Sequence, residues 1–189
     1  VFSIVVFSGK MIFQEKTTIE KTDNAGTLHD RLMTMGAQLV LKTVDAILEE
    51  NVQSVPQDKL FSDVSKLKSA PKIFKEDCRV DWNRPAREIY NLIRGLSPYP
   101  AAWTELVTND NEEGLRIKLF AAEQIEEPVE DGSRHLQPGS ISTDNKSYLD
   151  VAAKDGFLRI TTLQLTGKKR MNITDFLNGY HLEEKSRFR

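Results

Sequence analysis

Clusters of basic residues are the part of this sequence whose types and spacing best fit a chemical task. One cluster is a run of three adjacent cations after Gly167, and the other is a set of lysines spread over residues 51–75. Lysine and arginine side chains neutralise phosphates, and they fix the position of a polyanion without reading its sequence. The cations in question are Lys168, Lys169 and Arg170 in the first cluster, with Lys72 and Lys75 at the end of the second.

A third basic group helps to decide whether these clusters bind a polyanion or only keep a linker and a turn soluble. Arg87 and Arg94 are seven residues apart, which is close to two helical turns, so they share one face of a predicted helix. Charged linkers and solvated turns also explain lysine-rich segments, and that interpretation stays open. The three groups together favour a polyanion. Because the net charge of the chain is -2, nucleic-acid binding must use such local patches.

No catalytic or metal-binding motif stands out. The sequence contains no phosphate-binding glycine loop, no dinucleotide fingerprint and no Cys/His metal spacing. The single cysteine, Cys78, has no His or Asn near it in the sequence, so we interpret it as a structural thiol rather than a nucleophile. One cysteine without a secretion signal favours a reducing cytoplasm. No apolar run approaches the roughly 20 residues that span a bilayer, so no membrane partner is expected.

The first 50 residues predict extended segments and then one long helix. Apolar and β-branched residues dominate residues 10–19, which is typical of strands. Thr27 is in position to cap the helix, with Asp30 as a weak capping-box partner. A stripe with steps of three and four residues predicts a helix of about five turns packed on a sheet. The stripe consists of Leu28, Leu32, Met35, Leu39, Thr43 and Ile47.

Residues 51–75 lose this period and predict an interdomain linker that crosses the surface. A second helix follows. Asp81 or Asn83 is expected to cap it, and Gly95 is expected to end it just before two prolines. Its predicted buried face consists of Ala86, Ile89, Ile93 and Leu96. The tryptophans that flank this helix are predicted core anchors, with base stacking as the alternative role; they are Trp82 and Trp103.

The sequence after Pro100 predicts short strands. Residues 115–121 alternate, so that Arg116, Lys118 and Phe120 face away from the apolar side. Lys154-Asp155-Gly156 is typical of a hairpin turn, and a last short helix follows near residues 174–178. Several short strands with one helix before and one after predict a small closed barrel. With 189 residues, the chain has room for this domain and part of another, in an α+β fold.

Three blocks of sequence stand in an order that carries a family resemblance. The most specific block is KIFKEDCRVDWNRPAREIYNLIRGLSPYPAAW, at residues 72–103. The second is LQLTGKKRMNITDFLNGY, at residues 163–180, and TLHDRLMTMGAQLVLKTVDAIL, at residues 27–48, precedes both. In this order and spacing they resemble the methionyl-tRNA formyltransferases.

The resemblance implies a fold and a function. In that family a Rossmann-like N-terminal domain binds 10-formyltetrahydrofolate and transfers its formyl group to the methionyl group of initiator tRNA, in translation initiation. A C-terminal barrel with an OB-like arrangement helps to hold the tRNA. We therefore expect residues 1–50 to be a strand-helix remnant of the catalytic domain, residues 51–75 a linker, and residues 76–189 the OB-like, tRNA-binding barrel with flanking helices.

The same resemblance implies that this chain lacks the catalytic residues. The catalytic Asn and His of the family, and its folate pocket, lie upstream of anything that matches here. Its catalytic Asp precedes the strand equivalent to residues 11–14, and Phe7 occupies that position. Phenylalanine cannot act as a general acid or base. We therefore expect no formyltransferase activity from this chain alone.

The part that does match is the part that holds tRNA in the family. The resemblance implies phosphate contacts at Lys72, Lys75, Lys168, Lys169 and Arg170, and Arg94 matches a basic position of the family. Arg87 is added to the predicted tRNA-binding residues because it shares the helix face of Arg94. Arg94 also fits a structural role between helix and barrel. Three alternatives stay open. They are a related enzyme that acts on sugar nucleotides or on formyltetrahydrofolate, a non-catalytic nucleic-acid-binding module, and a structural fragment without binding.

Overall fold

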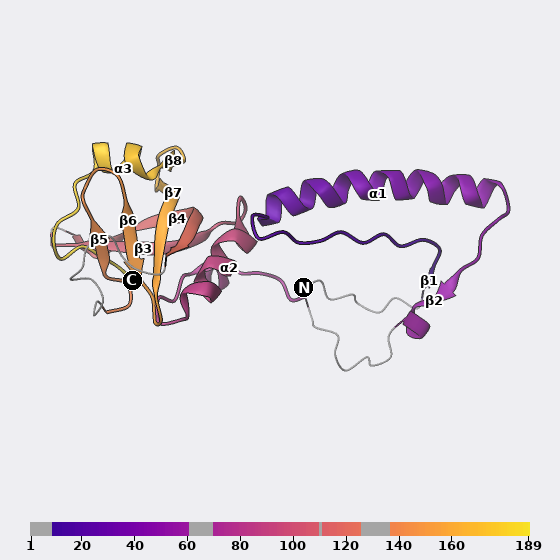
Figure 1. Ribbon diagram of the computed structural model, residues 1–189, viewed down its shortest axis with the longest axis horizontal. Coiled ribbons are helices and arrows are strands. Elements are labelled where there is room, and N and C mark those ends of the chain that lie inside the picture. The colour runs from indigo at the N-terminus through magenta and orange to yellow at the C-terminus, as the bar shows by residue number, and fades with distance from the viewer. Residues whose placement is uncertain (1–8, 61–69, 110, 126–136) are drawn as a thin grey trace. The chain divides into compact units, whose positions relative to one another are not determined.

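The computed structural model describes residues 9–60, 70–109, 111–125 and 137–189. The chain divides into two compact units. The first comprises Val1–Asp23 and Thr27–Ile73, and the second comprises Asn24–Gly26 and Phe74–Arg189. Each unit has its own sheet (Figure 1). The domain boundaries expected at residues 50 and 75 stay predictions.

The first unit contains one long helix and very little sheet. β1 (Lys10–Met11) pairs antiparallel with β2 (Val55–Pro56), which continues into the 3-10 helix η1 (Gln57–Leu60). The helix α1 spans Ala25–Leu48, and none of its residues is buried. The expectation that its apolar stripe packs on a sheet is therefore wrong for the described residues, because a sheet of two such short strands is too small to cover it.

The start of α1 is organised by Asp23 rather than by Thr27. The Asp23 carboxylate accepts hydrogen bonds from the Glu20 amide at 2.8 Å and from the Thr27 hydroxyl at 3.2 Å. Arg31, two turns into the helix, donates to both of its oxygens, at 2.6 and 2.9 Å. These Arg31 bonds lower the pKa of Asp23, followed by the bond from the Glu20 amide. Thr27 lies inside the first turn, so the predicted cap at Thr27 is wrong.

The second unit is an antiparallel barrel with three helical segments among its described residues. Its strands follow the order β5-β6-β7-β4-β3-β9, and β8 pairs with β7. The strands are β3 (Ala102–Thr108), β4 (Asn111–Ile125), β5 (Ile141–Thr143), β6 (Leu149–Ala152), β7 (Phe157–Leu165), β8 (Met171–Asn172) and β9 (Arg187–Phe188). The helices are η3 (Glu76–Cys78), α2 (Ala86–Leu96) and α3 (Ile173–Gly179).

The two ends of this strand order meet, so the barrel closes. β9 pairs with β3 on one side. On its other side, the Phe188 amide donates to the Gly139 carbonyl at 2.8 Å, and Ser140 forms an antiparallel bridge with Arg187. Ser140 directly precedes β5, which completes the ring. A small closed antiparallel barrel with flanking helices is the predicted α+β, OB-like fold, and the prediction is confirmed.

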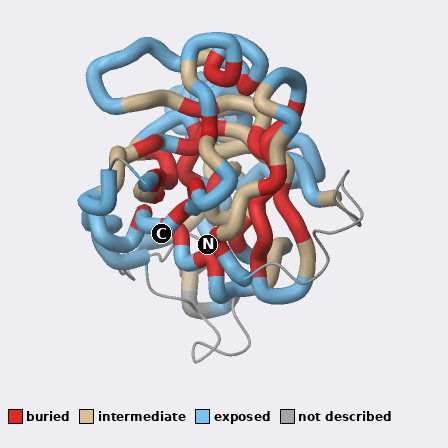
Figure 2. The backbone as a smooth tube through the Cα atoms, turned by 90° about the vertical axis from the view of Figure 1, so that its left-hand side faces the viewer, coloured by how far each residue is buried: buried red, intermediate tan, exposed pale blue. Residues whose placement is uncertain are grey.

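One hydrophobic core fills the barrel, and Figure 2 shows the buried positions concentrated along its strands. The helices α2 and α3 contribute to the same core, α2 through Ile89, Ile93 and Leu96, as its periodicity predicted. Trp82 and Trp103 are 3% and 4% exposed, which confirms them as core anchors. Burying one large apolar side chain contributes about 1.5–3 kcal/mol, so this shared core is what holds α2 and α3 against the strands.

The helix α2 is capped from a distant part of the chain. The Ala86 amide donates to Oδ1 of Asp155 at 2.7 Å, and Asp155 lies in the β6–β7 turn, 69 residues further on. Asp81, one of the two predicted caps, instead accepts the amide of Asn83 at 3.0 Å. The helix continues one residue beyond Gly95. The predicted end at Gly95 is therefore one residue early. The predicted caps Asp81 and Asn83 are wrong, because a contact as distant in sequence as that of Asp155 leaves no local pattern.

Candidate nucleic-acid-binding face

The basic loop between β7 and β8 is tied to the strand that precedes it. Gly167 has φ +76, a left-handed conformation that glycine adopts at no steric cost. The Lys168 amide donates to the Leu165 carbonyl at 3.0 Å, and the Gln164 side-chain amide donates to the Lys168 carbonyl at 2.7 Å. The backbone therefore holds the loop in place while its three cations face solvent. They are Lys168, Lys169 and Arg170.

Arg170 covers an aromatic ring on the outside of the barrel. Its guanidinium lies 3.7 Å from the centroid of the Phe120 ring on β4. Phe120 points away from the apolar side of β4, as predicted, yet it is only 7% exposed. A cation over an aromatic face contributes roughly 0.5–2 kcal/mol. Arg170 is thus partly a structural residue, whereas Lys168 and Lys169 extend from the loop.

The end of the lysine-rich segment is fixed to the barrel through its backbone. Nε1 of Trp103 donates to the Lys75 carbonyl at 2.8 Å, so the residue before η3 has a set position beside β3. The Lys75 side chain is exposed. Trp82, in turn, donates from Nε1 to the Thr104 hydroxyl at 3.0 Å. Because both indole rings are buried and both N–H groups are bonded, the alternative of base stacking by these tryptophans is not supported.

A cross-strand row connects the two basic clusters. Trp103 on β3 lies opposite Lys118 on β4, and Lys118 lies opposite Gln164 on β7. We call these three residues the Lys118 row. Side chains that are opposite each other on neighbouring strands share a face of the sheet. At about 4.8 Å per strand spacing, the row spans roughly 10 Å. Lys75 meets it at Trp103, the basic loop meets it at Gln164, and the exposed Lys118 lies at its centre.

Two arginines pack against Trp103 beside this row. The Arg116 guanidinium lies 4.2 Å from the ring centroid of Trp103 and that of Arg79 lies at 5.3 Å. Nε of Arg116 is buried and has no hydrogen-bond partner among the described residues. Sequence reasoning did not select Arg116 or Lys118 as site residues. The sequence did contain a signal for them: Arg116 and Lys118 alternate with apolar residues along one strand, and this alternation places both cations on the same outward face.

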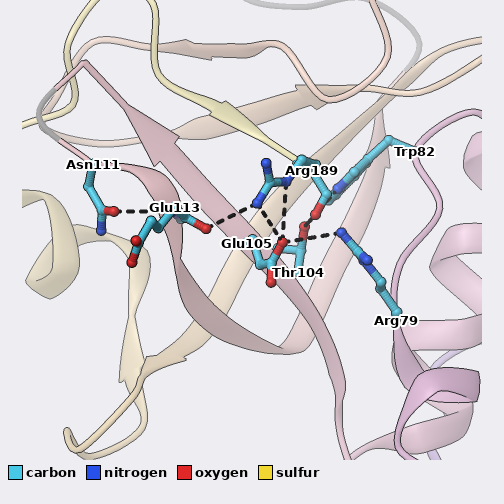
Figure 3. A network of polar contacts seen from close by, with 8 residues as sticks. Arg79, Trp82, Thr104, Glu105, Asn111, Glu113 and Arg189 are labelled. Carbon is cyan, nitrogen blue, oxygen red and sulfur yellow. Dashed lines mark hydrogen bonds and ion pairs between the residues drawn. The ribbon is translucent and has the colours of Figure 1, made fainter.

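A network of polar contacts fixes Arg79 and the end of the chain (Figure 3). Oε2 of Glu105 receives hydrogen bonds from Arg79 at 3.2 Å and from Arg189 at 3.1 Å. The Arg189 carbonyl accepts from the Thr104 hydroxyl at 3.1 Å. The network therefore connects β3 to the residue that follows β9. It also holds the guanidinium of Arg79 near the Trp103 ring.

Cys78 lies beneath this face and does not behave as a nucleophile. It is 2% exposed, and its Sγ contacts the Phe74 carbonyl at 3.5 Å. Burial raises the pKa of the Cys78 thiol, the Asp77 carboxylate raises it further, and the charge of Lys118 acts in the opposite direction. A buried thiol with a raised pKa is unreactive. The structural interpretation of Cys78 is therefore the better one.

The remaining predicted site residues lie on other elements. Arg87 and Arg94 both belong to α2, where Nε of Arg94 donates to the Asn91 side chain at 2.8 Å and the guanidinium lies 5.7 Å from the Tyr90 ring. Lys72 is exposed and belongs to the first unit. Phe7 lies outside the described residues. The structure thus joins Lys75 and the basic loop on one face.

A groove of about 580 Å³ opens beside the barrel closure, lined by Arg79, Asp81 and Arg187 among others. The Trp82 ring in this groove is stacked on Phe188, with ring centroids 5.6 Å apart. In the part of the chain that the structure describes, no three acidic, His or Cys side chains form a group that could hold a metal ion. No helix there is long and apolar enough to cross a membrane.

Comparison with known proteins agrees with this description. Residues 72–181 match the family described as "Formyl transferase, C-terminal domain". Proteins named methionyl-tRNA formyltransferase are 53% identical over 173 residues in Parabacteroides distasonis and 48% identical over 180 residues in Phocaeicola vulgatus. These alignments cover 92% and 95% of this chain but 52% and 54% of the relatives. The chain therefore spans about half the length of the curated relatives that it matches.

Solved structures share the fold at low sequence identity. The structure of a HypX variant from Aquifex aeolicus has a TM-score of 0.52 and 18% identity, over 78% of this chain and 24% of that one. A HypX structure in complex with tetrahydrofolic acid gives 0.50 over 74% of this chain and 22% of that one, also at 18% identity. At this identity the likeness supports the fold alone. The match of residues 72–181 to the family model shows the family itself. The chain therefore belongs to the formyl transferase family, whose C-terminal domain it contains.

Proposed function

We propose that this chain is the tRNA-holding part of a methionyl-tRNA formyltransferase. Such an enzyme transfers a formyl group from 10-formyltetrahydrofolate to the methionyl group of initiator tRNA, for translation initiation in the cytoplasm. The observation that carries the proposal is the Lys118 row, which connects Lys75 to the basic loop across β3, β4 and β7. The names and identities of the relatives support the choice of tRNA over another polyanion.

The face has the form that a phosphate backbone requires. Its cations stand at both ends and at the centre of a span of roughly 10 Å, which is long enough for more than one phosphate of a strand. Lysine side chains act there as mobile point charges, and each one that neutralises a phosphate releases counterions. An open face without a closed pocket suits a long polyanion better than a sugar nucleotide, which needs enclosure on several sides.

The arginines would hold the backbone in a more directional way. A guanidinium that lies over an aromatic ring keeps N–H groups at its edges, and these can donate to two phosphate oxygens together. Arg170 over Phe120 and Arg116 over Trp103 have this arrangement. Arg87 and Arg94 on α2 would extend the contact beyond the row, and Lys72 of the first unit stays a proposed phosphate contact of its own. All of these contacts position the RNA and read no sequence.

We also propose that the chain alone does not transfer the formyl group. The proposal rests on Phe7, which stands where the family has its catalytic Asp and cannot act as a general acid or base. The check is a formylation assay with the purified chain, methionyl initiator tRNA and 10-formyltetrahydrofolate. If the assay yields more formyl-methionyl-tRNA than a reaction without protein, the chain is active alone and this part of the proposal is wrong. The proposal that the chain binds tRNA does not depend on this result.

The direct test of the tRNA contact is the salt dependence of binding. Fluorescence anisotropy with labelled initiator tRNA is measured over a salt series for the chain and for Lys168→Ala/Lys169→Ala. We expect the slope of log K against log salt to fall by roughly 0.7–0.9 for each phosphate that the variant no longer neutralises. Lys146→Ala/Lys154→Ala removes the same charge from exposed positions elsewhere and serves as the control. Equal slopes for the two double variants contradict the proposed site, and an excess of sugar nucleotide should leave binding unchanged.

A further inference from the structure

Tyr99 is exposed to an extent that its surroundings do not explain. It is 84% exposed, more than any other large apolar side chain that is exposed among the described residues. It lies at the tip of the turn between α2 and β3. Both residues at the base of this turn are buried, Ser97 at 3% and Ala101 at 2%. An aromatic ring is thus held out into solvent from a buried base.

The turn itself is anchored on both sides. The Ser97 carbonyl accepts the amide of Gly26 at 3.0 Å, and the Ala101 amide donates to the Leu96 carbonyl at 2.9 Å. A Cβ on Gly26 would lie 2.6 Å from Cδ of Pro98, so the backbone there is in close contact with the turn. The prolines on either side of Tyr99 have fixed φ angles. The turn therefore has little conformational freedom left to give up when a ligand stacks on the ring.

The turn that carries the exposed ring contacts the central cation of the face described above. Nζ of Lys118 lies 3.5 Å from the carbonyl oxygen of Pro100, the residue that follows Tyr99. An exposed aromatic ring beside a line of cations is the arrangement by which proteins hold unpaired nucleic acid: the bases stack on the rings and the charges follow the backbone. The two tryptophans are buried, so among these three rings Tyr99 is the one open for stacking.

We propose that Tyr99 is a stacking platform for an unpaired base of the RNA whose phosphates lie along the Lys118 row. This inference rests on the proposed function and makes it more specific, because the bases inside a duplex are already stacked on their neighbours. The substrate end near Tyr99 must therefore be single-stranded. A protein partner is the other occupant that an exposed tyrosine could have, but the ammonium group of Lys118, which contacts the Pro100 carbonyl of the same turn, favours a polyanion.

The test uses two RNA hairpins of the same stem, one blunt and one with a four-nucleotide single-stranded 3′ extension. Anisotropy at one salt concentration gives Kd for the full chain and for three variants. We expect the extended RNA to bind more tightly than the blunt one. Tyr99→Phe should keep this preference, since the ring remains. Tyr99→Ala and Tyr99→Leu should weaken binding of the extended RNA by about 5- to 100-fold and leave the blunt RNA unchanged.

Further measurements separate this inference from the proposed function. 2-Aminopurine in the extension should be quenched by the chain and by Tyr99→Phe, but not by Tyr99→Ala. Lys168→Ala/Lys169→Ala should weaken both RNAs by the same factor. If the chain binds both RNAs without preference, or Tyr99→Ala binds the extended RNA as the chain does, the stacking role is wrong while the basic face stands. If the chain binds neither RNA, the stacking role of Tyr99 and the proposed RNA-binding function of the basic face are both wrong. Unchanged thermal unfolding of Tyr99→Ala controls for folding.

Discussion

The amide of Phe188 donates to the carbonyl of Gly139 at 2.8 Å, and this bond closes the barrel between β9 and the segment before β5. Gly139 has φ +88, which L-residues with a side chain rarely adopt. A Cβ at this position would lie 2.3 Å from the Phe188 carbonyl oxygen. Both the conformation and the close approach require glycine. The closure of the barrel therefore depends on one residue without a side chain.

Gly139→Ala should destabilise the second unit by about 2 kcal/mol or more, because a left-handed alanine costs roughly 1–2 kcal/mol and the methyl group also displaces β9. Urea unfolding followed by circular dichroism measures the change. Gly179→Ala is the matched control, since a Cβ at Gly179 meets nothing within 4 Å. Equal stability of the two variants shows that the closure is not tight.

Asp155→Ala should destabilise the barrel by about 1 kcal/mol, the usual effect of removing an N-terminal cap. The reason is the 2.7 Å bond between the Asp155 carboxylate and the Ala86 amide at the start of α2. Asp155→Asn retains an acceptor oxygen at that position and should be destabilised less. The measurement is the free energy of unfolding of Asp155→Ala compared with that of Asp155→Asn. A decrease as large in Asp155→Asn as in Asp155→Ala argues against the cap.

Asp144→Asn should reveal a stabilising contribution that depends on pH. Hydrogen bonds from the hydroxyl and then the amide of Ser147 hold the pKa of Asp144 far below its ordinary value of about 3.9. A lowered pKa stabilises the fold in full above that ordinary value, and the contribution declines as the pH falls further. The difference in unfolding free energy between the chain and Asp144→Asn should therefore be constant near pH 7 and shrink steadily below about pH 4. A constant difference down to about pH 2 would rule this out.

The helix α1 should exchange its amide protons much faster than the barrel strands. No residue of α1 is buried, whereas all four residues of β6 are. Helices owe most of their stability to tertiary packing, so an uncovered helix opens more easily than a buried strand. Hydrogen exchange followed by mass spectrometry compares the two elements in one experiment. Protection of α1 equal to that of β6 would mean that its apolar stripe is covered in solution.

Local patterns in the sequence predicted the elements of the barrel well. The apolar steps of Ile89, Ile93 and Leu96 marked the buried face of α2, and the turn residues 154–156 marked the β6–β7 hairpin. These signals lie within one element or between strands joined by a short turn. The prediction for α1 failed, because an apolar stripe indicates that a helix needs a partner but not whether the described residues provide one.

The candidate face was only partly predictable. Lys75 and the basic loop were visible as clusters, but the connection between them passes through Lys118 and requires the register of three strands. Register depends on pairing between residues that are far apart in the sequence, which a linear pattern does not contain. The burial of the two tryptophans was predicted, whereas the exposure of Tyr99 had no signal in the local sequence.

Lys118→Ala is the most direct test of the proposed face, because Lys118 lies at its centre and its side chain is exposed. Anisotropy with initiator tRNA over a salt series is run side by side for the chain and this variant. We expect the slope of log K against log salt to fall by about one unit, with unchanged thermal unfolding. Identical slopes would mean that no phosphate reaches Lys118 and that the two basic clusters do not form one binding face.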